Sequence, residues 1–354
     1  LQRDGYSVRP IVRAPSSYAA LSRFDLDGRV ADARDSTALV AAFSGCDVVV
    51  HAAAGDRSLV VDSIAPTFRA ASQAGVRRLV YLSSLVVHGY DPAATTDETS
   101  PLVNRHEIDY CNWKVAAEAR LQELRQHGGP EVVILRPGIV WGPRSQWVRD
   151  FAKALGAGRA CVIGDGAGVC PSIHVDNLVQ AIELASCREG VDGEAFIVGD
   201  REAVTWRDLY APIVEALGRS WAADLHHVAA VPPETSAKRF VQTLRRSSPV
   251  QSLRGKLPAR WKAAAFAAID RFGTVPDVVS PFAPLPSADI EVTREMSLLQ
   301  QCGAKLSHGK AERLLGYEPR LSFADGMAIT LAWLSFAGYL PMEGDSWPNA
   351  AERP

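Results

Sequence analysis

Short continuous apolar runs recur along the first 200 residues of the chain and predict β-strands. A strand buried on both faces lacks the alternation of apolar and polar residues, and the clearest runs follow this rule. The predicted strands cover residues 7–13, 46–52, 78–83, 131–136 and 194–198. Their composition indicates a sheet that is covered on both faces.

Segments with a helical period separate these runs. They cover residues 37–43, 63–74, 109–127 and 177–186. Glycines follow two of them, at Gly75 and at residues 128–129, as is usual at the C-termini of helices. Strands that alternate with helices form βαβ units, so we expect an α/β fold with a doubly wound, parallel sheet of the Rossmann type.

Beyond residue 199 the pattern becomes mostly helical. A helix is expected at residues 205–217, with Thr205 as its N-cap, and two more at residues 311–315 and 322–337. We therefore expect a smaller, mostly helical region after the sheet.

Composition narrows the class of protein. The 354 residues carry a net charge of −2, which argues against a general nucleic-acid binder. The longest apolar runs, such as residues 46–54, are shorter than the ~20 residues of a membrane span. Six scattered cysteines, without a CxxC pair or metal-ligand spacing, fit a reducing compartment. We expect a cytoplasmic protein without a metal.

The sharpest chemical signal is the pair Tyr110 and Lys114, which share one face of the predicted helix 109–127. A nearby ammonium favours phenolate and is expected to lower the pKa of Tyr110, so that it can act as an acid and a base. Such pairs also occur on ordinary exposed helices. Ser83 and Ser84 strengthen the case, because they end a predicted strand where a hydroxyl can reach the phenol and a substrate carbonyl.

Five stretches, in this order, make the chain resemble the extended short-chain dehydrogenase/reductase family. This family contains NAD(P)-dependent epimerases, dehydratases and hydroxysteroid-type dehydrogenases. The stretches are residues 80–89, 110–118, 135–143, 173–177 and 315–319. The resemblance covers residues 7–200 well and the end of the chain loosely.

The resemblance implies a role for each matching residue at the reaction centre. Tyr110 would be the acid and base for the reacting oxygen, and Lys114 would hydrogen-bond the nicotinamide ribose and tune Tyr110. Ser84 would orient the substrate carbonyl, with Ser83 as the alternative if the register is shifted by one. Glu118 is expected to form an ordinary i,i+4 pair with Lys114.

The remaining matches imply contacts with NAD(P). They are Asp32 and Ala33 beside the adenine, Ala52, Ala53 and Ala54 beside the phosphates and ribose, and Pro137 and Ile139 against the nicotinamide. NAD-preferring sites carry an acid after the second strand, where this chain has Arg13. A cation there can pair with a 2′-phosphate, which slightly favours NADP. The alternative is that Arg13 stacks on the adenine or faces solvent.

The chain departs from the family at its start. The family opens with a strand and a glycine-rich GxxGxxG turn before a helix that takes the pyrophosphate. This sequence opens at Leu1, in what matches the end of that helix. We expect the sequence to be N-terminally truncated and the predicted activity to belong to the complete chain.

The resemblance also implies a division into two domains. Residues 1–143 would bind the dinucleotide, and residues 172–199 would return to that domain. Residues 144–171 and 200–354 would form the substrate domain. Members of the family commonly form homodimers, so the resemblance makes a homodimer plausible for this chain.

The substrate class rests on a missing arginine. Nucleotide-sugar members usually carry an arginine just before the stretch that begins here at Ile173, but this chain has residues 170–172, Cys-Pro-Ser. This favours a hydrophobic secondary alcohol or ketone, oxidised or reduced through the Ser-Tyr-Lys triad. Two alternatives stay open: a nucleotide-sugar epimerase or dehydratase with tightly bound NAD, and a non-catalytic dinucleotide sensor.

Residues 238–262 carry eight basic residues and no acidic one. A stretch of this kind is compatible with weak contact to an anionic membrane surface. A solvated helix face or a lid over the substrate is the favoured interpretation.

Overall fold

The computed structural model describes residues 1–2, 5–22, 24–232 and 292–340. The chain divides into two compact units, one formed by residues 1–229 with 295–354 and the other by residues 230–294. The basic stretch 238–262 lies outside the described residues. Every feature of the fold and site below belongs to the first unit, apart from Arg294 at the start of one helix.

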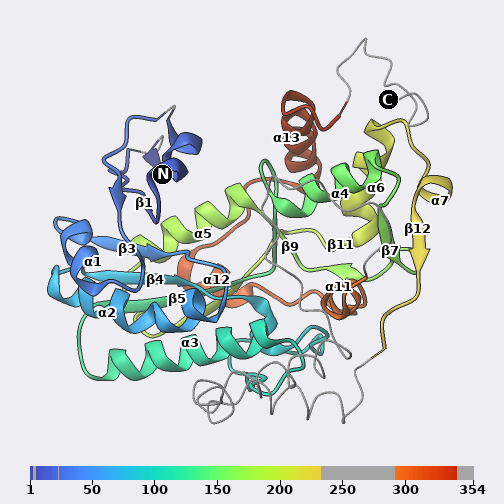
Figure 1. The fold of residues 1–354 in the computed structure, drawn as a ribbon. Coiled ribbons are helices and arrows are strands. Elements are labelled where there is room, and N and C mark those ends of the chain that lie inside the picture. Colours follow the sequence, from blue (N-terminus) through green and yellow to red (C-terminus); the bar gives the residue numbers. More distant parts are fainter. Residues whose placement is uncertain (3–4, 23, 233–291, 341–354) are drawn as a thin grey trace, which may run out of the picture. The chain divides into compact units, whose positions relative to one another are not determined.

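A parallel sheet forms the centre of the first unit (Figure 1). Its four strands lie in the order β10, β5, β4, β3 and span Ala195–Val198, Glu131–Pro137, Arg78–Leu82 and Val48–His51. Every neighbouring pair is parallel. The two inner strands are almost fully buried, which confirms the strands predicted from unbroken apolar runs.

Helices cover both faces of this sheet. One face carries α1 (Ser36–Phe43), α2 (Ile64–Gln73) and α3 (Asp109–Gln126), and the other carries α5 (Val175–Cys187) and α12 (Gly309–Leu315). Successive residues of β4 point to opposite faces: Leu79 and Tyr81 pack in the first layer and Val80 in the second. Figure 1 shows α3 and α5 on opposite sides of the strands. The expected α/β fold is therefore confirmed.

A separate two-stranded sheet lies near the start of the chain. β1 (Ile11–Val12) pairs in parallel with β2 (Arg29–Val30), and the 3-10 helix η2 (Pro15–Leu21) lies between them in sequence. The expected strand 7–13 is thus only two residues long. Within the described residues, β1 pairs with β2 and β3 pairs with β4, and no ladder joins β1 to β3.

The remaining elements form a mostly helical layer around a second core. Its longer helices are α4 (Gln146–Gly156), α6 (Trp206–Ala216), α11 (Arg294–Gln300) and α13 (Phe323–Phe336). Thr205 caps α6 in a capping box with Asp208, as predicted. Short elements complete the layer: α7 (Trp221–Asp224) and the strand pairs β6 (Ile139–Trp141) with β9 (Ser172–His174), β8 (Val169–Cys170) with β11 (Val204–Thr205), and β7 (Cys161–Ile163) with β12 (His226–Val228).

Within the described parts of the chain, no helix has both the length and the apolar character that a membrane span requires.

Candidate active site

The first turn of α3 places Tyr110 and Lys114 at the carboxyl end of β4. Lys114 is 2% exposed. Its ammonium donates hydrogen bonds to the Leu82 carbonyl at 2.7 Å and to the Tyr81 hydroxyl at 3.3 Å. It also lies 5.9 Å from the centre of the Tyr110 ring. The structure therefore brings Tyr110 and Lys114 together, and β4 holds the ammonium in place.

Burial controls the acidity of both groups. It lowers the pKa of Lys114 to about 8, because the charged ammonium has lost water. Burial, reinforced by the negative charge of Glu295, raises the pKa of Tyr110 to about 12. The expectation that Lys114 lowers the pKa of Tyr110 is thus wrong: the ammonium bonds to β4, and desolvation of the phenolate dominates. Tyr110 is protonated at neutral pH and can donate a proton.

The two candidate serines differ in their surroundings. Ser84 lines a cavity together with Tyr110, and its Oγ accepts the N–H of Val86 at 3.4 Å as the N-cap of the 3-10 helix η4 (Leu85–His88). The Ser83 Oγ is buried and finds no hydrogen-bond partner among the described residues. Ser83 does not line that cavity. Ser84 is therefore the serine that shares a space with the phenol.

This cavity, called the reaction cavity below, has a volume of about 230 Å³. The predicted residues Ser84, Tyr110 and Ile139 line it, whereas Lys114 and Pro137 do not. Its other lining residues are Leu85, Val86, Tyr90, Gly138, Val140, Trp147, Pro171, Glu295 and Leu299. The sequence analysis missed Tyr90 and Glu295, which carry no motif and meet only through the fold.

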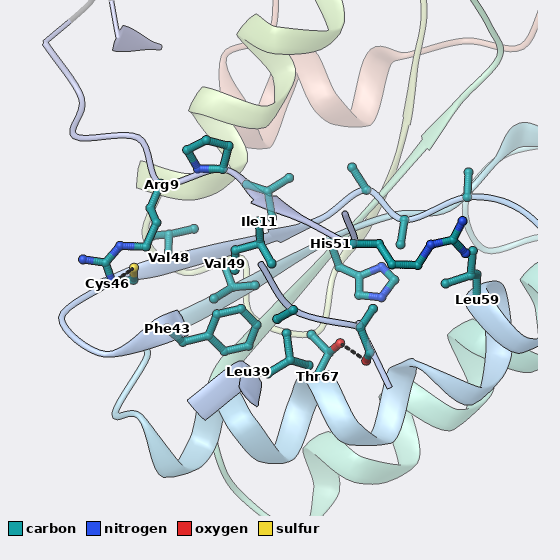
Figure 2. A pocket seen from close by; sticks show the side chains of 18 of the residues that line it. Arg9, Ile11, Leu39, Phe43, Cys46, Val48, Val49, His51, Leu59 and Thr67 are labelled. Atoms are coloured by element: carbon teal, nitrogen blue, oxygen red, sulfur yellow. Dashed lines mark hydrogen bonds between the residues drawn. The ribbon is translucent and has the colours of Figure 1, made fainter. Parts of the chain in front are cut away.

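A larger cavity of about 570 Å³, called the edge cavity below, lies between β1 and β3. Figure 2 shows Ile11 of β1, Val49 of β3, and Leu39 and Phe43 of α1 around it. The predicted cofactor residues that line it are Arg13, Ala33, Ala52, Ala53 and Ala54. Five of the expected cofactor contacts thus meet at one space.

Asp32 is the predicted adenine contact that does not line the edge cavity. Its carboxylate accepts hydrogen bonds from the Arg34 guanidinium at 2.6 and 2.8 Å. These bonds hold the pKa of Asp32 well below its usual range. The carboxylate is therefore already occupied by a neighbouring side chain.

His51, at the end of β3, also faces the edge cavity (Figure 2). Its Nε2 lies 2.9 Å from the Ser63 hydroxyl, and its Nδ1 has no partner among the described residues. Burial, with the positive charge of Lys114 as a smaller cause, lowers the pKa of His51 to about 4. The imidazole is therefore neutral at physiological pH and adds no charge to this space.

The residues present fit one part of NAD(P). Ala52, Ala53 and Ala54 line the edge cavity with small side chains, and Arg13 supplies a cation there. Ser83 and Lys114 are buried and line neither the edge cavity nor the reaction cavity. The sequence contains no GxxGxxG turn ahead of a helix for the pyrophosphate. The fit therefore covers the part of the cofactor that would lie beside Arg13 and residues 52–54.

A buried ion pair fastens α3 to β5. The Arg136 guanidinium donates to both Glu118 oxygens, at 3.1 and 2.7 Å, and the two side chains are 6% and 4% exposed. Arg136 also lies 3.2 Å from the His88 imidazole. The expected pairing of Glu118 with Lys114 is corrected here, because Glu118 bonds Arg136. This ion pair thus holds α3, the helix that carries Tyr110, against β5.

The described residues contain no group of three or more side chains placed to bind a metal ion.

Both the sequence and the fold of this chain are similar to those of known proteins. The family model "NAD dependent epimerase/dehydratase family" matches residues 1–199. The chain is 28% identical over 210 residues to a 3beta-hydroxysteroid-dehydrogenase/decarboxylase (isoform 1) of Arabidopsis thaliana, a match that covers 53% of this chain and 48% of the relative. It is 29% identical over 243 residues to a 3 beta-hydroxysteroid dehydrogenase/Delta 5-->4-isomerase of Mycobacterium tuberculosis, covering 61% and 64%.

The chain therefore spans between about half and two thirds of these relatives. Among solved structures, UDP-glucose 4-epimerase of Thermotoga maritima superposes with a TM-score of 0.65 at 19% identity, covering 95% of this chain and 93% of that one. A match at this identity shows the fold alone.

Proposed function

Because the chain belongs to the NAD-dependent epimerase/dehydratase family, we propose that it is an oxidoreductase that interconverts a secondary alcohol and a ketone with NAD(P). The observation that carries this proposal is the reaction cavity, which Ser84 and Tyr110 both line, with the Lys114 ammonium 5.9 Å from the centre of the phenol ring. A hydroxyl that orients an oxygen and a phenol that exchanges its proton are the groups such a reaction needs.

The three side chains have distinct tasks in this proposal. Ser84 donates a hydrogen bond to the reacting oxygen and orients it. Tyr110 is protonated at neutral pH, because its pKa is raised, and gives its proton to that oxygen when a ketone is reduced. Lys114, whose ammonium lies beside the phenol ring, hydrogen-bonds the nicotinamide ribose. The bound nicotinamide supplies or accepts the hydride.

Cofactor binding is proposed at the edge cavity. Ala33 and residues 52–54 would line the dinucleotide, Ile139 and Pro137 would contact the nicotinamide, and Asp32 would lie near the adenine. Arg13 is exposed, lines this cavity and forms no ion pair with a described residue, which supports a contact with a 2′-phosphate. We therefore propose NADP as the preferred cofactor, by a small margin over NAD.

The domain division is also a proposal. Residues 1–143 with 172–199 would hold the cofactor, and residues 144–171 with 200–354 would hold the substrate. The lining of the reaction cavity supports it, because Ser84 and Tyr110 come from the first set and Trp147, Pro171 and Glu295 from the second.

A further strand between β1 and β3 would complete the sheet. Both strands line the edge cavity, and no ladder joins them within the described residues. This supports the expectation that a longer polypeptide supplies a strand there. A chain extended by such a strand should bind NAD(P)H more tightly than residues 1–354, as measured by the fluorescence of the reduced nicotinamide. Equal affinity would contradict the expectation.

The epimerase or dehydratase alternative uses the same side chains but returns the hydride to its substrate. Net reduction of added NAD⁺ or NADP⁺ separates the two functions, because only a dehydrogenase accumulates reduced cofactor. We would offer the chain a 3β-hydroxysteroid and UDP-glucose in parallel. Accumulation of reduced cofactor with the steroid supports our proposal. Isomerisation of UDP-glucose without net reduction supports the alternative, and cofactor binding without turnover of either compound supports a sensor.

The choice between the two serines has its own test. Ser84→Ala should lower kcat/KM by about 10²-fold, the scale of removing one oriented donor, while Ser83→Ala should have a smaller effect. The reverse order would shift the orienting role to Ser83.

A further inference from the structure

Glu295 is the one charged side chain among the described residues that line the reaction cavity. It lies on α11, in the segment assigned above to the substrate domain. Its Oε1 accepts the Tyr90 hydroxyl at 2.6 Å, and Tyr90 is 4% exposed. The carboxylate is therefore held in a fixed position by a buried partner.

Much of the rest of the wall is apolar, including Leu85, Val86, Ile139 and Leu299. Ser84, Tyr110 and Trp147 carry hydrogen-bond donors, but Tyr90 is the one described residue that donates to Glu295. A carboxylate at an apolar surface is costly unless its oxygens accept hydrogen bonds. No described residue donates to Oε2, so this oxygen is free to accept a hydrogen bond from a ligand.

Holding Tyr90 does not by itself require a charge. A glutamine amide oxygen would accept the same hydroxyl without placing a charge in the cavity wall. A charge in this position becomes useful when a ligand brings a hydrogen-bond donor to it, because bonds to an ionised acceptor are shorter and stronger. The same charge repels any ligand that carries an anion.

We propose that Glu295 is a specificity residue that accepts a hydrogen bond from a second donor group, a hydroxyl or an ammonium, on the ketone or alcohol substrate. The inference rests on the proposed function, because it assigns the reaction cavity to the substrate. The substrate class becomes an apolar ketone or alcohol with a second hydroxyl or amino group and without a phosphate or carboxylate. Phosphorylated and carboxylated substrates are excluded by the same side chain.

Three matched ketones test this: cyclohexanone, 4-hydroxycyclohexanone and 4-oxocyclohexanecarboxylate. The wild-type chain, Glu295→Gln and the control Glu215→Gln would each be assayed for binding by calorimetry and for reduction with NAD(P)H. Glu215 is an exposed acid on α6, so the control removes one negative charge outside the cavity. The readout is the ratio of kcat/KM between two ketones, since any effect of Glu295 on Tyr110 cancels in that ratio.

The wild type should prefer 4-hydroxycyclohexanone over cyclohexanone by ~10–100-fold, the range of hydrogen bonds to charged groups, and should reject the carboxylate. Glu295→Gln should lower that preference about 10-fold and admit the carboxylate, while Glu215→Gln keeps the wild-type pattern. A Glu295→Gln variant that slows all three ketones equally overturns the proposal, and so does a wild type that binds the three alike.

The two proposals fail in different ways in this experiment. Binding that discriminates between the ketones, without any reduction, contradicts the oxidoreductase and leaves the role of Glu295 intact. Reduction of the three ketones at equal kcat/KM supports the oxidoreductase and contradicts the role of Glu295. Absence of both binding and reduction for all three ketones overturns both.

Discussion

The centre of the four-stranded sheet and the region around the separate β1–β2 pair differ in how completely they are packed. Around α3, β4 and β5, Lys114 and the pair Arg136–Glu118 are buried and bonded. Around β1 and β2, the pair Arg34–Asp32 is 44% and 31% exposed, and the edge cavity of about 570 Å³ remains. The first region, called the closed side below, holds the catalytic candidates, and the second, the open side, holds most of the cofactor candidates.

This difference shows which parts of the site are organised before any ligand binds. On the closed side, the chain's own groups fix the Lys114 ammonium by hydrogen bonds and shift the pKa values of Tyr110 and Lys114, chiefly by burial. On the open side, the exposed Arg34–Asp32 pair contributes little to stability, and Arg13 forms no ion pair with a described residue, so a ligand in the edge cavity would have to fix the position of Arg13. Substitutions on the closed side should therefore have larger effects than equivalent ones on the open side.

The largest effect is expected at Tyr110. Tyr110→Phe removes the exchangeable proton and keeps the ring, so the rate should fall by ~10²–10⁴-fold. Steady-state kinetics with the substrate that the wild type accepts would measure the loss, and thermal unfolding should show an unchanged midpoint. Turnover at the wild-type rate would remove Tyr110 from the mechanism.

The buried ion pair comes next. Glu118→Gln leaves Arg136 charged and without its buried partner, which should lower the free energy of unfolding by about 3–5 kcal/mol. Glu123→Gln is the matched control on the same helix, because Arg120–Glu123 is an exposed pair worth at most ~1 kcal/mol. Urea denaturation measures both, and equal losses would contradict the closed-side description.

A smaller effect is expected from the buried ammonium. The pKa of Lys114 is about 8 in the folded chain and 10.5 when unperturbed, so between these values the unfolded chain binds more protons. The free energy of unfolding contributed by Lys114 should therefore rise by about 2 kcal/mol from pH 7.5 to pH 10. Subtracting the same measurement on Lys114→Met isolates this contribution, and a difference that is flat with pH would show that the ammonium is not desolvated.

The smallest effect is expected on the open side. Arg13→Gln should weaken NADPH binding by about 10-fold and change NADH binding by less than ~3-fold, because only NADPH carries the 2′-phosphate. Arg69→Gln, at an exposed position of α2, is the charge-matched control. Equal loss for both cofactors would show that Arg13 contributes general charge only.

The sequence predicted the closed side better than the open side for a physical reason. Unbroken apolar runs predicted β4 and β5 because both strands are buried on two faces, and helical spacing placed Tyr110 above Lys114. By contrast, β1 is two residues long where a run of seven was expected, because a strand forms only where a partner pairs with it. Local pattern carries no information on pairing.

The missed residues depend on tertiary contact. Glu295 and Tyr90 are 205 positions apart in sequence, so no local motif could join them. The pKa of Tyr110 was predicted in the wrong direction because burial, which spacing alone does not predict, outweighs the neighbouring ammonium. The pairing of Glu118 with Arg136 likewise needed the packing of α3 on β5.

The outer rim of β3 has a practical consequence for handling the protein. Val50 is 37% exposed at a strand edge that has no ladder partner among the described residues. Such rims recruit strands from other molecules. At high concentration the chain should therefore self-associate through this rim. Val50→Lys should slow the rise in turbidity, because it places a charge at the edge.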